Sequence, residues 1–394
     1  MKKKSIAVIG GGPAALMFAA QVDTKLFDVT IYEKNKQFGR KFLVAGKGGF
    51  NLTHSEEIDA FIERYTPSDF LEPALRSFTN DDLPNWLESI GIPTIIGSSK
   101  RVYPEKGIKP IEVLEAILVQ LKKNKIHFAF EHEWLGWNEK NELLFNENRT
   151  VKADKVVFAL GGGSWPVTGS TGNWIDIFKK KGIDVVPFQP SNCAFQINWD
   201  KQFINQHEGQ PLKNCAISCG NKTQKGEGVF TQFGLEGNVM YGLSPQIREQ
   251  LNLKGKASFF IDFKPTLSES DVRIKLTSST LKNSTETLKI DLKLSSTQIA
   301  LLKSMTSKEE FKDSKIMAKY IKQFPLDVIG TAPIQDAIST VGGISRNALS
   351  PHFEIEILPN YYCIGEMIDW DAPTGGYLLQ ACFSMGTFLV KNIS

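Results

Sequence analysis

Apolar residues form two short runs near the start of the chain, and each run predicts a buried strand. Residues 5–9 read Ser-Ile-Ala-Val-Ile, and residues 28–33 read Asp-Val-Thr-Ile-Tyr-Glu. Short β-branched runs of this kind are typical of parallel strands that are covered on both faces. Residues 14–22, which lie between them, are rich in Ala and predict a helix packed on the sheet. The order strand, helix, strand predicts the start of an open α/β sheet.

A glycine motif joins the first strand to this helix. Gly10, Gly12 and Ala15 give the pattern G-x-G-x-x-A. Gly10 permits a tight turn, Gly12 lets a pyrophosphate approach the backbone, and Ala15 allows close helix packing. Glu33 ends the second strand near the usual spacing of about 20 residues, where an acid accepts hydrogen bonds from an adenosine ribose. The motif predicts a Rossmann-like dinucleotide site. An acid at Glu33 disfavours NADP, so NAD and FAD remain as alternatives.

The loop after Glu33 is rich in glycine and in cations. Residues 39–54 include Arg40, Lys41 and Lys47. Such a loop can lay backbone N–H groups and positive charge along a long phosphate-containing ligand. A plain NAD dehydrogenase does not need it. The alternative is a flexible basic surface loop.

Two later strands also end in glycine. Residues 55–125 are mainly helical by pattern, and residues 126–158 predict β structure. The apolar run 155–160 leads into Gly161 and Gly162, which we expect to press against a bound ligand. Near the C-terminus, a strand ends at Gly365-Glu366, and Gly375-Gly376 opens an apolar helix. Its N-terminus would face the strand ends, where ligands bind in open α/β sheets.

Composition narrows the class of protein. The 394 residues are 41% hydrophobic and 23% charged, which excludes a disordered chain and predicts two or three soluble domains. A net charge of +3 gives no argument for a nucleic-acid or membrane partner. Five scattered Cys without a Cys-x-x-Cys pair exclude a disulfide framework and a metal site. With no apolar stretch of membrane-spanning length, a cytoplasmic protein is expected.

These segments together resemble the two-dinucleotide-binding-domain flavoproteins, which bind FAD in an extended form. More narrowly, the chain resembles the HI0933-like flavoprotein family of NAD(P)/FAD-dependent oxidoreductases, from residue 5 to about residue 390. The matching segments are 10–14, 39–41, 45–53, 101–104, 159–162, 340–344 and 365–377.

The resemblance implies an α/β fold with a split FAD-binding domain. Residues 1–190 and 341–394 would form this domain. Residues 191–340 would form an inserted β-barrel-like and small helical domain, β-rich over 191–264 and helical over 270–340. The composition agrees, although residues 278–296 are polar enough for a solvated spacer.

The resemblance also implies which residues bind non-covalent FAD. The expected cofactor residues are Gly10, Gly12, Pro13, Ala14, Ala15, Glu33, Lys34, Arg40, Lys41, Gly46, Lys47, Gly48, Gly49, Asn51, Trp134, Ala159, Gly161, Gly162, Gly365, Glu366, Asp371, Gly375, Gly376, Tyr377 and Leu378. The chain departs from the family pattern at Gly49 and Phe50, where many members carry Arg and Cys, so a divergent branch is expected.

The leading functional hypothesis is an FAD-dependent oxidoreductase that transfers a hydride between flavin and a small molecule or NAD(P)H. No second nucleotide motif is present, so NAD(P)H would visit the flavin only transiently. The alternatives are a flavin-dependent RNA-modifying enzyme and a non-catalytic flavin-binding redox protein. A plain NAD dehydrogenase would explain neither the early basic loop nor the C-terminal glycine pair.

A substrate pocket is expected between the FAD domain and the insert, because pockets favour domain junctions. Its candidate wall residues lie on loops that flank the expected flavin ring. They are Arg101, Tyr103, Glu366 and Tyr377. Arg101 would favour an anionic group on the substrate, and its alternative role is a surface salt bridge.

Overall fold

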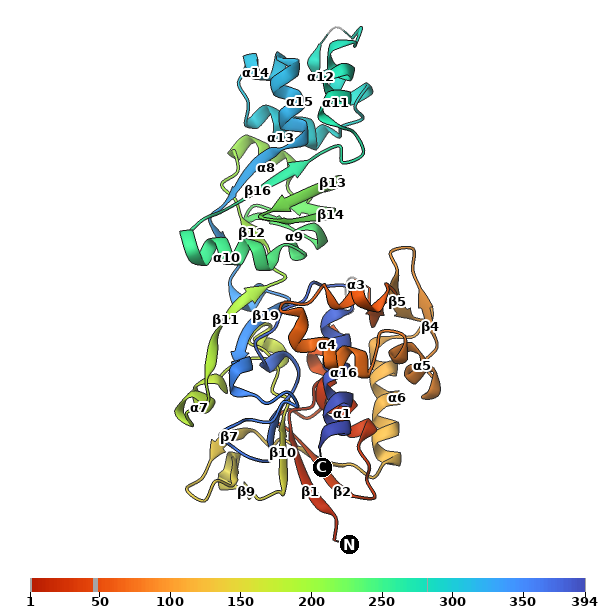
Figure 1. Cartoon of the computed structure of the whole chain (residues 1–394), viewed down its shortest axis with the longest axis vertical. Helices are drawn as coiled ribbons and strands as arrows, with labels where there is room; N and C mark the ends of the chain where they lie inside the picture. Colours follow the sequence, from red (N-terminus) through yellow and green to blue (C-terminus); the bar gives the residue numbers. More distant parts are fainter. Residues whose placement is uncertain (1, 45–48, 282, 394) are drawn as a thin grey trace. The chain divides into compact units, whose positions relative to one another are not determined.

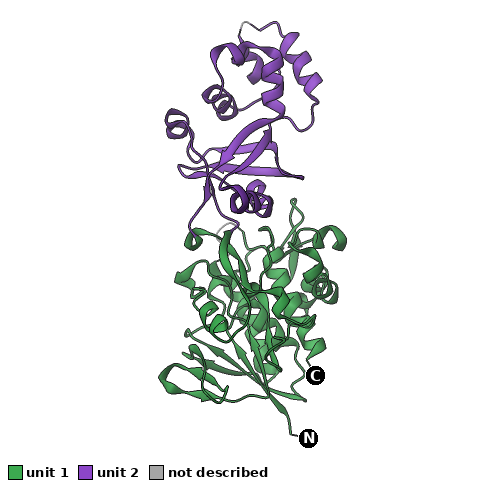
Figure 2. Cartoon of the chain, turned by 60° about the vertical axis from the view of Figure 1, so that its left-hand side comes forward, with its two compact units in different colours: residues 1–190, 334–394 green, residues 191–333 purple. Residues whose placement is uncertain are grey.

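The chain folds into two units, each with a hydrophobic core of its own. The structure is a computed structural model that describes residues 2–44, 49–281 and 283–393. Unit 1 consists of residues 1–190 and 334–394, and unit 2 of residues 191–333 (Figure 2). Unit 2 is therefore inserted into unit 1 along the sequence.

A parallel sheet forms the centre of unit 1. In the described part of the chain its strand order is β20-β10-β1-β2-β6, and every neighbouring pair is parallel. The strands are β1 (Lys4–Ile9), β2 (Phe27–Glu33), β6 (His127–Phe130), β10 (Lys155–Phe158) and β20 (Tyr361–Cys363). This sheet confirms the predicted Rossmann-like α/β fold.

Two helices from opposite ends of the chain pack side by side in unit 1 (Figure 1). They are α1 (Pro13–Gln21) and α16 (Tyr377–Asn392). A Cβ added to Gly386 would lie 2.6 Å from the Ala14 carbonyl oxygen, so only glycine permits this close approach. The C-terminal helix is thereby fixed against the helix of the glycine motif.

Smaller elements surround the central sheet. Strands β3 (Thr53–His54), β5 (Arg101–Pro104) and β4 (Thr94–Ile96) form a sheet with β5 in the middle, and β7 (Trp134–Trp137), β8 (Leu143–Phe145) and β9 (Thr150–Val151) form a meander. Strands β11 (Val185–Ser191) and β19 (Ser339–Ile344) pair with each other. The helices are α2 (Arg40–Val44), α3 (Ile58–Ile62), α4 (Ser68–Ser77), α5 (Asp82–Ser89), α6 (Pro110–Lys123) and α7 (Ile175–Lys180). Short 3-10 turns are η2 (Asn146–Asn148), η3 (Pro166–Thr168), η4 (Ile334–Asp336), η5 (Arg346–Ala348) and η6 (Gly365–Met367).

Unit 2 is built on an antiparallel sheet. The strand order over its described residues is β17-β16-β13-β14-β15-β12-β18. The strands are β12 (Phe195–Gln196), β13 (Pro211–Cys219), β14 (Lys222–Phe230), β15 (Gly234–Glu236), β16 (Ala257–Asp262), β17 (Phe324–Val328) and β18 (Gly330–Thr331). Helices α8 (Lys201–His207), α9 (Asn238–Tyr241) and α10 (Ser244–Lys254) belong to the same unit.

The helical part of unit 2 is shorter than the sequence suggested. It runs from α11 (Glu269–Thr277) through α12 (Ser284–Ile290), α13 (Ser296–Ser304) and α14 (Lys308–Lys312) to α15 (Ser314–Lys322). Residues 324–340, which we had included in it, contain β17, β18 and the start of β19 instead. The reason is an alternating pattern over Phe324–Val328 that lets β17 pair with β16.

The polar segment 278–296 is more than a solvated spacer. Asn283 caps the N-terminus of α12, and its side chain accepts a hydrogen bond from the Glu286 backbone N–H. Thr287 and Leu288 of the same helix are buried. Capping and a short apolar face therefore place α12 in the fold.

Candidate functional site

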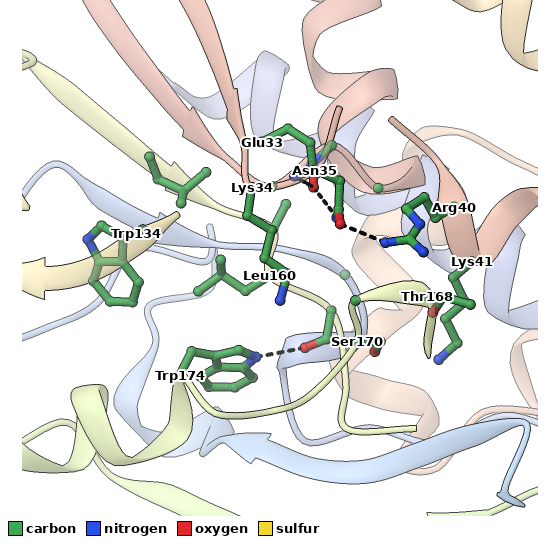
Figure 3. A pocket seen from close by; sticks show the side chains of 18 of the residues that line it. Glu33, Lys34, Asn35, Arg40, Lys41, Trp134, Leu160, Thr168, Ser170 and Trp174 are labelled. Atoms are coloured by element: carbon green, nitrogen blue, oxygen red, sulfur yellow. Dashed lines mark hydrogen bonds between the residues drawn. The ribbon is translucent and has the colours of Figure 1, made fainter. Parts of the chain in front are cut away.

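A cavity of about 380 Å³ lies at the carboxyl ends of the parallel strands of unit 1. Its lining includes Ile9 at the end of β1, Glu33 at the end of β2, Ala159 after β10 and Gly365 after β20. Figure 3 shows side chains from several of these elements converging on it. The volume falls in the range of about 300–1,000 Å³ that is usual for ligand sites.

The glycine motif shapes one wall of the cavity. Gly10 has φ +101°, and a Cβ there would lie 2.4 Å from the Ala159 carbonyl oxygen. A Cβ added to Gly12 would meet no described atom within 4 Å, although Gly12 lines the cavity. The backbone at Gly12 thus faces free volume at the start of α1. This is the arrangement that the approach of a phosphate requires.

Glu33 is held in place by two neighbours. Its Oε2 accepts a hydrogen bond of 2.8 Å from the Gly11 N–H, and its Oε1 accepts two from Asn35, at 2.9 Å from the backbone and 2.6 Å from Nδ2. The residue is only 8% exposed. A carboxylate has about four acceptor sites, so capacity for ribose hydroxyls remains.

The two cations of α2 line the cavity but bind protein groups. Arg40 donates from Nη1 to Asn35 Oδ1 at 2.7 Å and from Nη2 to the Val167 carbonyl at 2.8 Å. Lys41 Nζ donates to both oxygens of Glu366, at 3.0 and 2.9 Å, and to Ser164 Oγ at 2.9 Å. We had expected both cations to lie along phosphates. In the structure their main partners are an amide, a carbonyl, a hydroxyl and a carboxylate.

The Glu366 side chain packs against position 162, where only glycine leaves room for it. A Cβ on Gly162 would lie 2.9 Å from the Glu366 carboxyl group and 2.2 Å from Thr340 Oγ1. Glu366 Oε1 also accepts a hydrogen bond of 3.2 Å from the Thr340 N–H. Gly162 therefore acts by admitting Glu366 to the cavity wall, although Gly162 itself does not line the cavity.

The N-terminus of α16 makes a second close backbone contact. Gly376 has φ +102°, and a Cβ there would lie 2.5 Å from the Thr53 Cα. Thr53 is 0% exposed, and its Oγ1 has no hydrogen-bond partner among the described residues. Asn51 Oδ1 is buried and, within the same described ranges, equally without a partner. Most buried polar atoms in proteins have a hydrogen-bond partner, so Asn51 Oδ1 and Thr53 Oγ1 are candidate contacts for a bound group.

A polar cluster surrounds Glu56 beside this helix end. Arg64 donates from Nε and Nη2 to the Glu56 carboxylate at 3.1 and 2.8 Å, and the Tyr377 hydroxyl donates to Oε1 at 2.6 Å. The ring of His54 stacks on Tyr377 at 5.4 Å. Burial alone would raise the pKa of Glu56, but the hydrogen bonds from Arg64 and Tyr377 outweigh it and lower that pKa. Burial, together with the hydrogen bond to Glu56, raises the pKa of Tyr377.

The predicted cofactor residues fall into three groups. Those that line the cavity are Gly10, Gly12, Pro13, Ala14, Glu33, Lys34, Arg40, Lys41, Trp134, Ala159, Gly161, Gly365 and Glu366. Those outside its lining are Ala15, Gly49, Asn51, Gly162, Asp371, Gly375, Gly376, Tyr377 and Leu378. Gly46, Lys47 and Gly48 lie outside the described residues. Of the candidate wall residues, Glu366 lines the cavity, whereas Arg101, Tyr103 and Tyr377 do not.

Sequence reasoning missed the polar support of the cavity wall. Asn35 links Glu33 to Arg40 (Figure 3). Ser170 Oγ donates to the Gly162 carbonyl at 2.8 Å, and Trp174 Nε1 donates to the Gly161 carbonyl at 3.1 Å. The available signal was local: Asn35 follows the acid by two residues, and residues 166–174 form a Gly/Ser/Thr-rich turn after the second glycine run.

The residues present fit an FAD molecule. Gly12 leaves the cradle that a Cβ would fill, Glu33 faces the cavity, and Asn51 and Thr53 offer unsatisfied polar atoms. A family model, the HI0933-like protein Rossmann domain, matches residues 4–392. The chain belongs to this family. Its general class is therefore that of an FAD-dependent oxidoreductase.

Two named proteins are similar in sequence to this chain over nearly its whole length. A ribosomal RNA dihydrouridine synthase of Haemophilus influenzae is 24% identical, and the match covers 98% of each chain. A 3-dehydro-bile acid delta(4,6)-reductase of Clostridium scindens is 23% identical over 97% of each. An open flavocytochrome c3 fumarate reductase shares the fold, with a TM-score of 0.50 and 12% identity, over 99% of this chain and 78% of the other.

The described residues contain neither a membrane-spanning helix nor a cluster of metal ligands. No helix in them has both the length and the apolar character needed to cross a membrane. Within the same ranges, no group of three or more His, Cys, Asp or Glu side chains is placed to hold a metal ion.

Gly12→Val should abolish FAD binding. The valine side chain would fill the free volume through which a phosphate reaches the start of α1. Gly12→Ala, with a single added carbon, should bind more weakly than wild type and more tightly than Gly12→Val. FAD content by absorbance, with circular dichroism as the folding control, measures this. Stoichiometric FAD in Gly12→Val would mean that the phosphate site lies elsewhere.

Lys41→Met should weaken FAD binding through Glu366. The substitution leaves a largely buried carboxylate, 15% exposed, without its cation in a cavity that takes a diphosphate. Adding Glu366→Gln to Lys41→Met should then recover part of the affinity, with a coupling of about 1–3 kcal/mol. Calorimetric titration of the four apoproteins with FAD measures the cycle. Strictly additive effects would show that Lys41 contacts the cofactor directly.

Glu56→Gln should make the free energy of unfolding less sensitive to a fall in pH. Because folding lowers the pKa of Glu56, its contribution is present above the unfolded pKa and is lost as pH falls through the folded pKa. At pH 7 the variant should lose about 1–2 kcal/mol, since Arg64 is partly exposed and screened. Between pH 7 and pH 4, urea unfolding should show a smaller loss than in wild type. The exposed neighbour substitution Glu57→Gln is the control, and an equal acid response in both variants would contradict the assignment.

Proposed function

We propose that the protein is an FAD-dependent reductase that saturates a carbon–carbon double bond conjugated to a carbonyl group. Two relatives that match over nearly full length support this reaction class. Dihydrouridine is uridine whose ring double bond, next to a carbonyl, has been reduced. A delta(4,6)-reductase acting on a 3-dehydro bile acid reduces double bonds conjugated to a ketone. The two substrates differ greatly in size, but the reacting groups are alike.

The observation that carries the proposal is the cavity at the strand ends. Gly12 leaves volume for a pyrophosphate, and Glu33 is held at the position that takes a ribose. Reduced FAD, when bound, supplies a hydride. We infer that the backbone of the Gly10–Ala14 turn, Glu33 and Glu366 hold this cofactor, and that Asn51 and Thr53 provide polar contacts near α16.

The proposed reaction requires residues of this chain that stabilise negative charge on the substrate. When a hydride adds to the far carbon of a conjugated double bond, negative charge grows on the carbonyl oxygen. That charge is stabilised by fixed donors and by the positive end of a helix. The start of α16, opened by Gly375 and Gly376, offers such an end beside Arg101.

We propose a small-molecule enone as the first substrate class and a uracil base in RNA as the second. The RNA candidate has one observation of its own. Between residues 191 and 333 the sequence has 19 Lys and Arg against 14 Asp and Glu, so the excess of positive charge lies in unit 2. Phosphate contacts by Lys and Arg dominate affinity for nucleic acids. This partition was not anticipated from the net charge, which had suggested no nucleic-acid partner.

NAD(P)H is the proposed physiological reductant. Only one G-x-G-x-x-A motif precedes a helix in the sequence. The nicotinamide would therefore bind only transiently, deliver its hydride and leave before the substrate arrives.

Anaerobic reoxidation of the reduced holoprotein tests the proposed function. Flavin reduced with dithionite should be reoxidised by cyclohex-2-enone or by ribosomal RNA, and not by cyclohexene, whose double bond is unconjugated. RNA that reacts should gain two hydrogens per modified uridine by mass spectrometry. Reduction by NADH and NADPH is followed separately. If neither the enone nor the RNA reoxidises the flavin faster than cyclohexene does, the proposed reaction class is wrong.

A further inference from the structure

We propose that one face of the helical part of unit 2 binds the phosphate backbone of RNA. This face is a basic strip that consists of Lys315, Lys319 and Lys322 of α15, with Lys264 and Lys293 beside its end. The inference rests on the RNA form of the proposed function and assigns the surface that holds such a substrate. The strip belongs to unit 2, whereas the residues that line the cofactor cavity belong to unit 1.

Positive charge is concentrated in one part of the sequence. Residues 264–322 have 12 Lys and Arg against 7 Asp and Glu, whereas the rest of unit 2 has 7 of each. Unit 1 has 27 Lys and Arg against 29 Asp and Glu. The small net charge of the chain therefore conceals a basic helical part, a neutral β part and a weakly acidic unit 1. A basic patch confined to one part of a protein is expected where a polyanion binds.

Helix α15 directs its apolar side chains inward and its lysines outward. Met317 and Ile321 are buried in the core of unit 2, and α15 packs against α11 and α14 (Figure 1). Lys315 and Lys319 are exposed, and Lys322 is partly exposed. Residues three or four apart on a helix have Cβ atoms about 5–6 Å apart on the same side. The three lysines therefore form a row along the outer side of α15.

Lysines from three separate segments meet at the C-terminal end of this row. Lys322 Nζ donates to the Lys264 carbonyl at 2.7 Å, and Lys264 Nζ donates to the Lys293 carbonyl at 3.1 Å. Burial first, and then the charge of Lys293, lower the pKa of Lys264. Lys322 pairs with Asp262 at 2.6 Å, and the other cations of residues 264–322 form no ion pair within the described part of the chain. Most of the positive charge of the strip is therefore unmatched.

Several acids of the helical part are bound to the backbone at helix N-termini. Asp271 accepts a hydrogen bond of 3.0 Å from the N-cap residue of α11, and Glu310 accepts one of 2.8 Å from that of α14. Asp313 accepts hydrogen bonds of 2.8 and 2.9 Å from the first turn of α15. These carboxylates stabilise helix ends. They form no ion pair with Lys315 or Lys319.

The chemistry of the strip fits a phosphate backbone better than a lipid surface. A helix that lies in a membrane interface needs a broad apolar face directed outward. The apolar residues of α15 are mostly used in the core of unit 2, and Ile316 is only 37% exposed. A row of lysines instead matches a row of phosphates, and each such contact gains affinity by releasing counterions. RNA is the polyanion among the proposed substrates.

Fluorescence anisotropy with a short fluorescein-labelled RNA hairpin tests the strip in the FAD-loaded protein. For wild type, the logarithm of the affinity should fall linearly with the logarithm of the salt concentration. Lys315→Gln/Lys319→Gln should weaken binding on the order of 10-fold and reduce the salt slope by about 2, since each lost phosphate contact removes about 1. Neither side chain has a hydrogen-bond partner in the described ranges. FAD content and circular dichroism provide the folding control.

The matched control is Lys122→Gln/Lys123→Gln, which removes two exposed cations at the end of α6 in unit 1. It should bind the hairpin as wild type does. Failure of wild type to bind the hairpin would overturn the inference, and so would equal binding by wild type and Lys315→Gln/Lys319→Gln. An equal loss in the control would reduce the effect to net charge and also overturn it. Binding of wild type to phosphatidylglycerol vesicles but not to the hairpin would overturn it in favour of a lipid surface.

A kinetic measurement separates this inference from the proposed function. When ribosomal RNA reoxidises the dithionite-reduced flavin, kcat/KM should fall on the order of 10-fold in Lys315→Gln/Lys319→Gln, mainly through a higher KM. If ribosomal RNA reacts equally fast with wild type and with this variant, the inference alone fails. If the hairpin binds through the strip but neither RNA nor cyclohex-2-enone reoxidises the flavin, the RNA-binding surface stands and the proposed function fails.

Discussion

The whole site depends on close contacts between backbone segments that only glycine permits. Gly10 brings the turn after β1 against the Ala159 carbonyl, Gly386 brings α16 against α1, and Gly376 brings the start of α16 against Thr53. A Cβ at any of these positions would lie within 2.6 Å of a backbone atom. These contacts bring together the beginning, the middle and the end of the chain. The C-terminal helix therefore completes a site that the N-terminal motif begins.

Oppositely charged side chains near the cavity and near the start of α16 form ion pairs with each other. Lys41 and Glu366 come from opposite ends of the sequence and pair beside the cavity, and Glu56 takes up Arg64. Partly buried pairs of this kind contribute little net stability, but removing one partner is costly because the other charge is left behind. These pairs determine which charged side chains have a partner within the protein and which do not. Arg101, beside the start of α16, forms no ion pair with any residue that the structure describes.

The sequence revealed the parts of the site that are local in the chain. The strand, the G-x-G-x-x-A turn and Glu33 follow one another within one βαβ unit, so their spacing alone predicts the nucleotide site. The Lys41–Glu366 pair was not foreseen as a pair, because no spacing rule joins residues so far apart. Residues 324–328 were assigned to a helical part because they follow a Lys-rich helical segment. The alternation of buried and exposed positions over Phe324–Val328 was a local signal for a strand, and pairing with β16 fixes that strand in unit 2.

The loop that departs from the family pattern has a backbone and packing suited to the residues this chain carries there. Gly49 has φ +105°, a conformation that an arginine rarely adopts, and a Cβ there would lie 3.3 Å from the Tyr103 ring. The Arg that many relatives carry at this position is therefore not simply missing, since the local backbone is shaped for glycine. Phe50 replaces their Cys with a buried ring packed edge-on against Phe42 at 4.8 Å, so no thiol acts at that position. A cation does lie beside the start of α16, but it comes from another strand: Arg101 of β5 has its Nε 3.3 Å from a Cβ built on Gly375.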